Sequence, residues 1–219
     1  MLRTAALSLL LLLAGWSAVS WLTYGFQAWT DEDARRLEVA LRPVPAPEVA
    51  VQGADAQTVE LPALLREGGV TIADFIYTDC QTICLTLGGT FQQLQAALQA
   101  DAAAGTASGV RLLSLSFDGA RDDPPTLRAY AARMNADPAL WRFVRVPAPE
   151  QEQALLRRLG VVVVPDGRGD YEHNAALLVF DARGRMVRVF DLAEQQLALD
   201  YARHLARQGR PPAGMEAAS

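Results

Sequence analysis

The feature that most constrains the fold is an alternation of apolar runs with helical patterns along the chain from residue 70 onward. An apolar run of strand length at 70–78 is followed at 87–103 by leucine and phenylalanine residues spaced as on one helix face. A second apolar run at 110–117 precedes another helical pattern at 121–136, which opens with acidic residues and prolines. Strands that alternate with helices are typical of a sheet covered by helices.

The remainder of this region adds a hairpin to the alternation. A short strand is predicted at 141–146, and a helix follows it and ends at Leu159. Two apolar runs within 174–191 flank an Ala-Arg-Gly sequence, which indicates a hairpin, and a last helix is predicted from about Glu194 to Gln208. This order predicts an α/β domain of thioredoxin type, with a mixed sheet flanked by helices.

Both cysteines of the chain, Cys80 and Cys84, lie at the first strand-to-helix junction, with three residues between them. Such a junction falls at the carboxyl edge of the sheet, where the sites of α/β proteins gather. An i, i+4 spacing brings two residues onto one face of a helical turn, and the N-terminus of a helix favours thiolates. A disulfide, a metal site and two inert core thiols all remain open, although the position favours chemistry over packing.

The donor set narrows the choice of metal. Two thiolates are soft ligands that suit Cu(I), whereas structural zinc normally takes four ligands. The chain has two histidines, and His204 in the last helix is expected to be a surface or packing residue. His173 comes immediately before the buried strand of the hairpin, and the loop entering that strand lies beside the cysteine loop in a thioredoxin-type sheet. His173 is therefore the candidate third ligand, and a plain polar loop residue is the alternative.

These segments resemble the Sco/SenC family, which are membrane-tethered, thioredoxin-like copper chaperones of cytochrome c oxidase assembly. The resemblance covers about Val49 to Tyr201 and rests on FIYTDCQTIC, SFDGARDDPPTLRAYA and HNAALLVFDARGRMVRVF. It implies that Cys80, Cys84 and His173 bind copper, as Cu(I). It also implies that the cysteine pair can cycle between dithiol and disulfide.

The chain departs from the family pattern at three positions. Leu85 follows the second cysteine where proline is usual, and Gly119 stands where proline is customary. Asn174 follows the histidine where a hydroxyl residue is common. None of these departures removes a ligand, but they indicate a divergent branch whose client need not be an oxidase.

Two acidic residues, Asp118 and Asp122, occupy the usual acidic positions of the family. They also come shortly before a predicted helix. Because aspartate is a favourable residue at helix N-termini, we expect both to cap and solubilise that helix.

Two functions of different classes follow. The first is a copper metallochaperone without turnover, which delivers its metal to an exported copper-protein client such as cytochrome c oxidase subunit II. The second is a thiol-disulfide oxidoreductase that reduces client cysteines, with Cys80 or Cys84 as the attacking thiolate and a separate thiol reductant. A chaperone needs His173 and a reductase largely does not. A peroxide-reducing relative is disfavoured because no Thr and Arg constellation accompanies the cysteines, and a net charge of −5 without basic runs argues against nucleic acid.

Residues 1–30 predict a membrane anchor. The stretch from Thr4 to Thr30 has no charged residue and, at about 1.5 Å per residue, can cross a hydrocarbon core of about 30 Å. An aromatic belt at the interface would consist of Trp21, Tyr24 and Trp29. A cleaved signal peptide is the alternative, because Ala18-Val19-Ser20 is a small-x-small site. Charge counting leaves the orientation open, and the resemblance implies a single-pass inner-membrane protein with its domain in the periplasm.

The rest of the chain divides into three parts. Residues 31–48 are expected to be a Pro-rich linker that tethers the domain in extended form. Residues 49–208 form the thioredoxin-like domain, and 209–219 are expected to be a disordered tail. A length of 219 residues at 51% hydrophobic content suffices for one packed domain with an appendage.

Overall fold

The computed structural model describes residues 2–79, 83–106, 109–167 and 170–209, and for residues 83–86 it describes the backbone alone. Cys80 and the predicted tail from residue 210 onward therefore lie outside the described residues, as does the side chain of Cys84. The chain forms two compact units, Met1–Arg42 and Pro43–Ser219, which are described separately.

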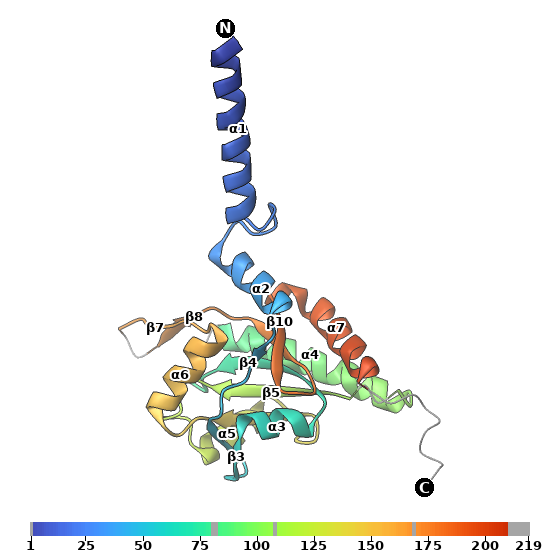
Figure 1. The fold of residues 1–219 in the computed structure, drawn as a ribbon. Helices are drawn as coiled ribbons and strands as arrows, with labels where there is room; N and C mark the ends of the chain where they lie inside the picture. Colours follow the sequence, from blue (N-terminus) through green and yellow to red (C-terminus); the bar gives the residue numbers. More distant parts are fainter. Residues whose placement is uncertain (1, 80–82, 107–108, 168–169, 210–219) are drawn as a thin grey trace. The chain divides into compact units, whose positions relative to one another are not determined.

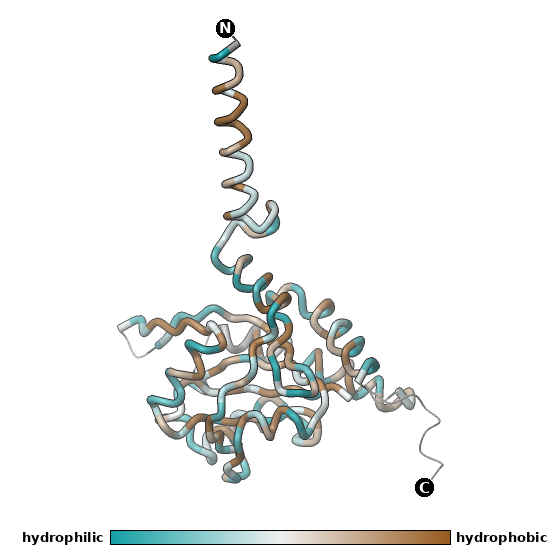
Figure 2. Tube along the Cα trace, viewed as in Figure 1, coloured by the Kyte–Doolittle hydropathy of each residue, from teal (hydrophilic) through white to brown (hydrophobic). Residues whose placement is uncertain are grey.

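The first unit begins with a long apolar helix, α1 (Leu2–Leu22). Its stretch Arg3–Leu22 is long and apolar enough to cross a membrane by length and composition, and Figure 2 shows that its apolar residues concentrate toward the middle of the helix. After α1 the chain turns back, and the Phe26 ring lies 4.7 Å from the Trp16 ring. The uncharged stretch therefore consists of one helix followed by an aromatic turn.

A second helix, α2 (Asp31–Leu41), lies in the range predicted as a Pro-rich linker. Its first turn is closed by a capping box. The Thr30 hydroxyl accepts a hydrogen bond from Asp33 N at 3.0 Å, and the Asp33 carboxylate accepts one from Thr30 N at 3.1 Å. Acidic residues in the first turn also favour the helix through its dipole. This stretch is consequently helical.

The second unit is an α/β domain (Figure 1). Its helices are α3 (Leu61–Glu67), α4 (Ile83–Ala103), α5 (Pro124–Arg133), α6 (Pro149–Leu159), the 3-10 turn η1 (Leu192–Glu194) and α7 (Gln195–Gln208). Its strands are β1 (Val44–Pro45), β2 (Ala50–Gly53), β3 (Thr58–Glu60), β4 (Val70–Ile76), β5 (Val110–Ser116), β6 (Trp141–Arg145), β7 (Val163–Pro165), β8 (Tyr171–His173), β9 (Leu177–Phe180) and β10 (Arg185–Phe190).

The main sheet is mixed, with the strand order β1-β10-β9-β4-β5-β6-β2-β3. The three central strands β4, β5 and β6 are parallel, and β9 and β2 pair with them in the antiparallel direction. All seven residues of β4 are buried, which agrees with a strand in the middle of a sheet covered on both faces. Strands β7 and β8 form a separate antiparallel pair.

Helices cover both faces of this sheet. One apolar core joins α4, α5 and α7 to the face that carries Val70, Ile72 and Ile76 of β4. On the opposite face lie α3 and α6 (Figure 1). A mixed sheet flanked by helices, together with an apolar N-terminal helix, is the architecture predicted from the sequence.

Two local predictions differ from the structure. The end of the stretch expected to be an extended tether belongs to the sheet, because Val44 and Pro45 of β1 pair with Met186 and Arg185 of β10. The compact unit accordingly begins at Pro43, ahead of the predicted start at Val49. His173, placed in a loop by the sequence, is the last residue of β8.

Candidate metal site at the carboxyl edge of the sheet

The parallel strands β4 and β5 end at the same edge of the sheet, and the candidate site lies there. Beyond the end of β4 come Tyr77 and Thr78, and beyond the end of β5 comes the β5–α5 loop (residues 117–123). Cys80, two residues after Thr78, lies outside the described residues. Cys84 is the second residue of α4, where only the backbone is described.

The β7–β8 pair brings His173 to this edge. The His173 ring lies 5.0 Å from the Phe117 ring, measured between centroids. The Tyr171 ring meets the rings of Tyr77 and Phe117 edge-on, at 5.2 and 5.6 Å. Tyr77, three residues before Cys80, also packs on Phe117, so the Phe117 ring connects His173 to the segment that leads into the cysteines.

The imidazole of His173 has the properties of a metal ligand. Both of its ring nitrogens, Nδ1 and Nε2, are buried and have no hydrogen-bond partner among the described residues. Burial lowers the pKa of His173, so the ring is neutral at pH 7. A buried polar atom without a partner costs about 1–3 kcal/mol, whereas a neutral imidazole nitrogen is a common ligand for metals. His173 therefore fits a metal held at this edge.

The side chains described by the structure do not complete a metal site by themselves. Within that set, no group of three or more His, Cys, Asp or Glu side chains is arranged to hold a metal ion. The two cysteines are not part of the set. His204 lies exposed on α7, with its Nε2 at 2.9 Å from Gln208 Nε2, in agreement with the surface role expected for it.

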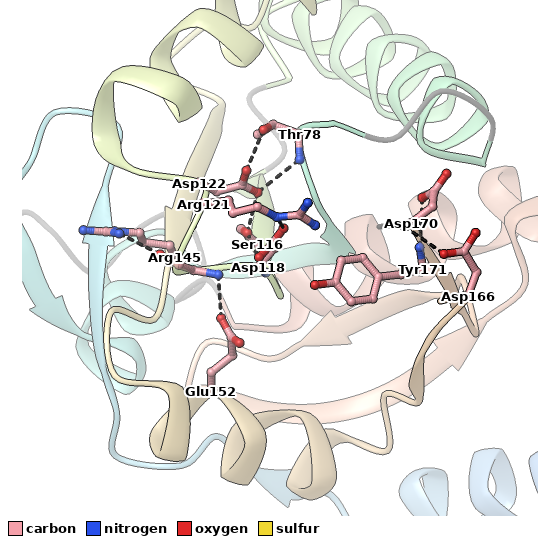
Figure 3. Close-up of polar contacts among 11 residues, drawn as sticks. Thr78, Ser116, Asp118, Arg121, Asp122, Arg145, Glu152, Asp166, Asp170 and Tyr171 are labelled. Atoms are coloured by element: carbon pink, nitrogen blue, oxygen red, sulfur yellow. Dashed lines mark hydrogen bonds and ion pairs between the residues drawn. The ribbon is translucent and has the colours of Figure 1, made fainter. Parts of the chain in front are cut away.

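A buried carboxylate fixes the backbone that leads into Cys80 (Figure 3). Asp122, 2% exposed, accepts hydrogen bonds from Thr78 N at 3.0 Å and from the Thr78 hydroxyl at 2.5 Å. The Ser116 hydroxyl donates to the same carboxylate at 2.6 Å. On the other side of the residue, Arg133 Nη2 donates to Thr78 O at 3.3 Å. The last described turn before the cysteines is thus held through both its N–H and its carbonyl.

The same β5–α5 loop also reaches the strand that carries His173. Arg121 forms a hydrogen-bonded ion pair with Asp118, and its guanidinium lies 5.4 Å from the centre of the Tyr171 ring (Figure 3). Asp118 is also held through its backbone, because its N–H donates a hydrogen bond to Ser116 Oγ at 3.0 Å. One loop therefore contacts both parts of the candidate site.

Helix α6 adds a further carboxylate to this edge. Glu152 accepts a hydrogen bond from Gly119 N at 2.8 Å, and Arg145 Nη1 donates to Gly119 O at 2.6 Å. Burial raises the pKa of Glu152 to about 7, and the nearby charges of Asp118 and Asp122 act in the same direction. The carboxyl group of Glu152 is therefore partly protonated at neutral pH.

The expectation that Asp118 and Asp122 cap and solubilise the next helix is wrong. The cap of α5 is Asp123, whose carboxylate accepts a hydrogen bond from Thr126 N at 2.9 Å. Asp118 and Asp122 are buried in the loop before it. Burial also raises the pKa of Asp122 above its ordinary value, against the hydrogen bonds it accepts.

Comparison with known proteins identifies the family. A family model described as SCO1/SenC matches residues 60–207. The chain belongs to the SCO1/SenC family.

Individual Sco proteins are distant in sequence but alike in fold. An SCO1 protein homolog of Bacillus subtilis is 28% identical over 145 residues, which is 65% of this chain and 72% of the relative. ScoI of Bradyrhizobium japonicum, solved with copper bound, superimposes with a TM-score of 0.60 at 23% identity, over 74% of this chain and 99% of that one. BsSco, described with a disulfide switch and as a member of the Sco family of cytochrome c oxidase assembly proteins, gives 0.64 at 21% identity, over 76% and 95%. The predicted thioredoxin-like fold is confirmed.

Sequence reasoning missed several residues of this Sco site. Tyr77 and Tyr171 gave no signal, because each lies in an ordinary apolar or loop context and their contact depends on the tertiary fold. Glu152 looked like a plain helix residue. The only available hint was the pair of acidic residues after the second apolar run, and it was interpreted as helix capping.

Proposed function

We propose that this Sco protein is a copper metallochaperone that binds Cu(I) through Cys80, Cys84 and His173. The observation that carries the proposal is the state of His173. Its imidazole is neutral, both ring nitrogens are buried without a partner among the described residues, and the ring packs on Phe117 at the carboxyl edge of the sheet. A bound metal ion would give one of these nitrogens the partner that it lacks.

The chemistry of the donors favours copper in its reduced form. Two thiolates are soft donors with two negative charges, and a neutral imidazole completes a three-coordinate shell without adding charge. Cys84 is the second residue of a 21-residue helix, where the partial positive charge of the N-terminus favours a thiolate. Copper is bound by ScoI of Bradyrhizobium japonicum, a solved relative, and we extend that metal to this chain.

We propose that the metal is delivered to a client. Ligand exchange would pass Cu(I) from the two thiolates to incoming ligands of an exported copper protein. The description of BsSco as one of the cytochrome c oxidase assembly proteins supports a respiratory oxidase, through its subunit II, as the client. Another exported cuproprotein is the alternative client.

The second candidate function is that of a thiol-disulfide oxidoreductase, and the disulfide switch described for BsSco favours it. One thiolate would attack a client disulfide, and the other would displace the client thiol and close the Cys80–Cys84 disulfide. Two electrons and two protons pass to the client in this exchange. A thiol reductant would then regenerate the dithiol.

We further propose that α1 is retained as a single-pass anchor in the inner membrane, with the domain facing the periplasm. The helical stretch Arg3–Leu22 is long and apolar enough to cross the bilayer. Alkaline extraction should leave the protein in the membrane pellet, and protease added to spheroplasts should digest the domain. Recovery in the soluble periplasmic fraction without the residues before Trp21 would instead establish a cleaved signal peptide.

Competition with a chromophoric Cu(I) chelator tests the copper site. The reduced wild-type protein should bind one Cu(I), and Cys80→Ser or Cys84→Ser should abolish tight binding because a hydroxyl is a poor ligand for Cu(I). His173→Ala should weaken binding by at least about tenfold, equivalent to about 1.4 kcal/mol. The matched control is His204→Ala, which should leave the affinity unchanged. Equal affinities for wild type and His173→Ala would contradict the ligand assignment and favour the oxidoreductase.

A further inference from the structure

We propose that Asp122 is a positioning residue for the cysteine pair, holding the peptide that enters the Cys80 segment. The proposal deepens the proposed function, since it rests on Cys80 and Cys84 being the reactive groups of the site. Asp122 itself would touch neither the metal nor a client. Its role would be to fix where the first cysteine lies.

Two of the hydrogen bonds of Asp122 come from one residue, Thr78, which lies two residues before Cys80. Its Oδ2 atom accepts from Thr78 N and from the Ser116 hydroxyl, and its Oδ1 atom accepts from the Thr78 hydroxyl. All three donors are neutral, and the carboxylate is almost completely buried. A helix cap does not account for the residue, because Asp123 performs that function. What the buried charge does instead is join the end of β4 to the end of β5.

The short distance along the chain from Thr78 to Cys80 makes the contact with Asp122 relevant to the position of Cys80. An extended residue spans at most about 3.3–3.6 Å, so Cys80 cannot lie more than about 7 Å along the chain from Thr78. On the far side, helix α4 begins at Ile83. Cys80 is therefore two residues from a peptide that Asp122 holds. Loss of the bonds to Thr78 is expected to affect Cys80 more than Cys84, which belongs to α4.

The opposite part of the site depends on the same loop. Phe117, at the start of the β5–α5 loop, contacts the ring of His173, and Arg121 lies against Tyr171 two residues before that histidine. Asp122 follows Arg121 directly. A carboxylate at this position therefore links Thr78, which precedes Cys80, to the loop that contacts the strand of His173.

A pair of isosteric substitutions in the full-length protein tests this role. Asp122→Asn keeps the shape of the side chain but replaces one acceptor oxygen by an NH2 group. This group is itself a donor and cannot accept the hydrogen bonds that the carboxylate accepts. Asp123→Asn is the matched control on the next residue, because asparagine caps a helix as well as aspartate does. For both variants and wild type, the reduced protein is alkylated with iodoacetamide, and the rates at Cys80 and Cys84 are followed separately by peptide mass spectrometry. Thermal unfolding and Cu(I) competition are measured on the same samples.

The expected result is a change in the alkylation rate of Cys80 of about tenfold, with a smaller change at Cys84, in a protein that remains folded. Asp123→Asn should match wild type at both cysteines. A folded Asp122→Asn protein with wild-type rates at both cysteines would overturn the proposal, because a merely structural carboxylate would change stability alone.

A second variant decides the question if Asp122→Asn does not fold. Thr78→Val removes only the hydroxyl bond to Asp122 and keeps the backbone bond, so a changed Cys80 rate supports the proposal and wild-type rates overturn it. The alkylation rates do not depend on copper. If the wild-type protein binds no Cu(I), the proposed copper site fails, while the effect of Asp122 on Cys80 is still decided by the alkylation rates.

Discussion

The substitution Asp74→Asn is expected to remove a pH dependence from the stability of this protein. Asp74 lies in the middle of β4 and is 1% exposed. Its Oδ1 atom has no partner among the described residues, and its carboxylate accepts a hydrogen bond from the Ser114 hydroxyl, whose oxygen accepts one from Trp141 Nε1 at 2.9 Å. Burial raises the pKa of Asp74 to about 7, against the opposing effect of the Ser114 hydrogen bond.

The size of the effect follows from linkage between protonation and folding. The ordinary pKa of the aspartate is 3.8, so the folded state holds a proton that the unfolded chain releases. Because the folded pKa is the higher one, this contribution is fully present below about pH 4 and is lost as the pH rises to about 7. At about 1.36 kcal/mol per pKa unit, the loss between pH 5 and pH 7 is on the order of 2 kcal/mol. Asparagine does not ionise and avoids the loss.

Urea unfolding of the full-length protein at pH 5 and pH 7, followed by circular dichroism, measures this difference. The free energy of unfolding of Asp74→Asn relative to wild type should increase by about 2 kcal/mol between the two pH values. Asp55→Asn, at an exposed position between β2 and β3, is the control and should follow wild type. Glu152 and Asp122 are present in all three proteins, so their titration cancels in the comparison. Parallel profiles for wild type and Asp74→Asn would refute the reasoning.

Three further substitutions test the packing around the sheet, each by urea unfolding. Gly119→Ala should destabilise the fold by about 1–3 kcal/mol, because a Cβ there would lie 2.3 Å from the carbonyl oxygen of Val146. Gly89→Ala should be stabilising by about 0.5–1 kcal/mol, since it lies inside α4 and a Cβ there meets nothing within 4 Å. Trp141→Phe should cost about 1–3 kcal/mol, because the buried hydroxyl of Ser114 loses its indole donor; an unchanged stability would show that this hydrogen bond contributes nothing.

The elements that the sequence predicted well are those whose burial produces a long local pattern. Strands β4 and β5 are buried along nearly their whole length, so they appear as continuous apolar runs. Helix α4 repeats its apolar residues at helical spacing because Leu87, Phe91, Leu94 and Leu98 all face the sheet. In these stretches the local pattern and the tertiary environment agree.

The elements that were missed have no such pattern. Strands β1 and β2 are short and pair with partners far along the chain, since Val44 lies opposite Met186 and Gln52 opposite Arg145. Their prolines and glycines indicate a linker when the sequence is considered alone. The β7–β8 pair is equally short, and its residues become strands only because they pair with each other across a loop.

The candidate site divides along the same line. The cysteines and His173 could be proposed because residue type and position relative to a strand or helix suffice to single them out. The role of Asp122 could not, because its partner Thr78 lies 44 residues earlier in the chain. An acidic residue before a helix has a simpler local explanation, and only the fold shows that the neighbouring Asp123 already provides the cap.

The distribution of buried polar atoms without a hydrogen-bond partner is consistent with a functional site at the carboxyl edge of the sheet. Five buried side-chain atoms lack a partner among the described residues: Asp74 Oδ1, Tyr77 Oη, both ring nitrogens of His173 and Gln195 Oε1. Three of these five, Tyr77 Oη and the two ring nitrogens of His173, lie at the carboxyl edge, whereas Asp74 Oδ1 lies in the middle of β4. Each such atom costs about 1–3 kcal/mol, which a fold selected for stability alone would avoid. Departures of this kind concentrate where function sets the requirement. The apolar faces that hold α4 and α7 to the sheet thus support a carboxyl edge where polar atoms remain unsatisfied, as the proposed copper site requires.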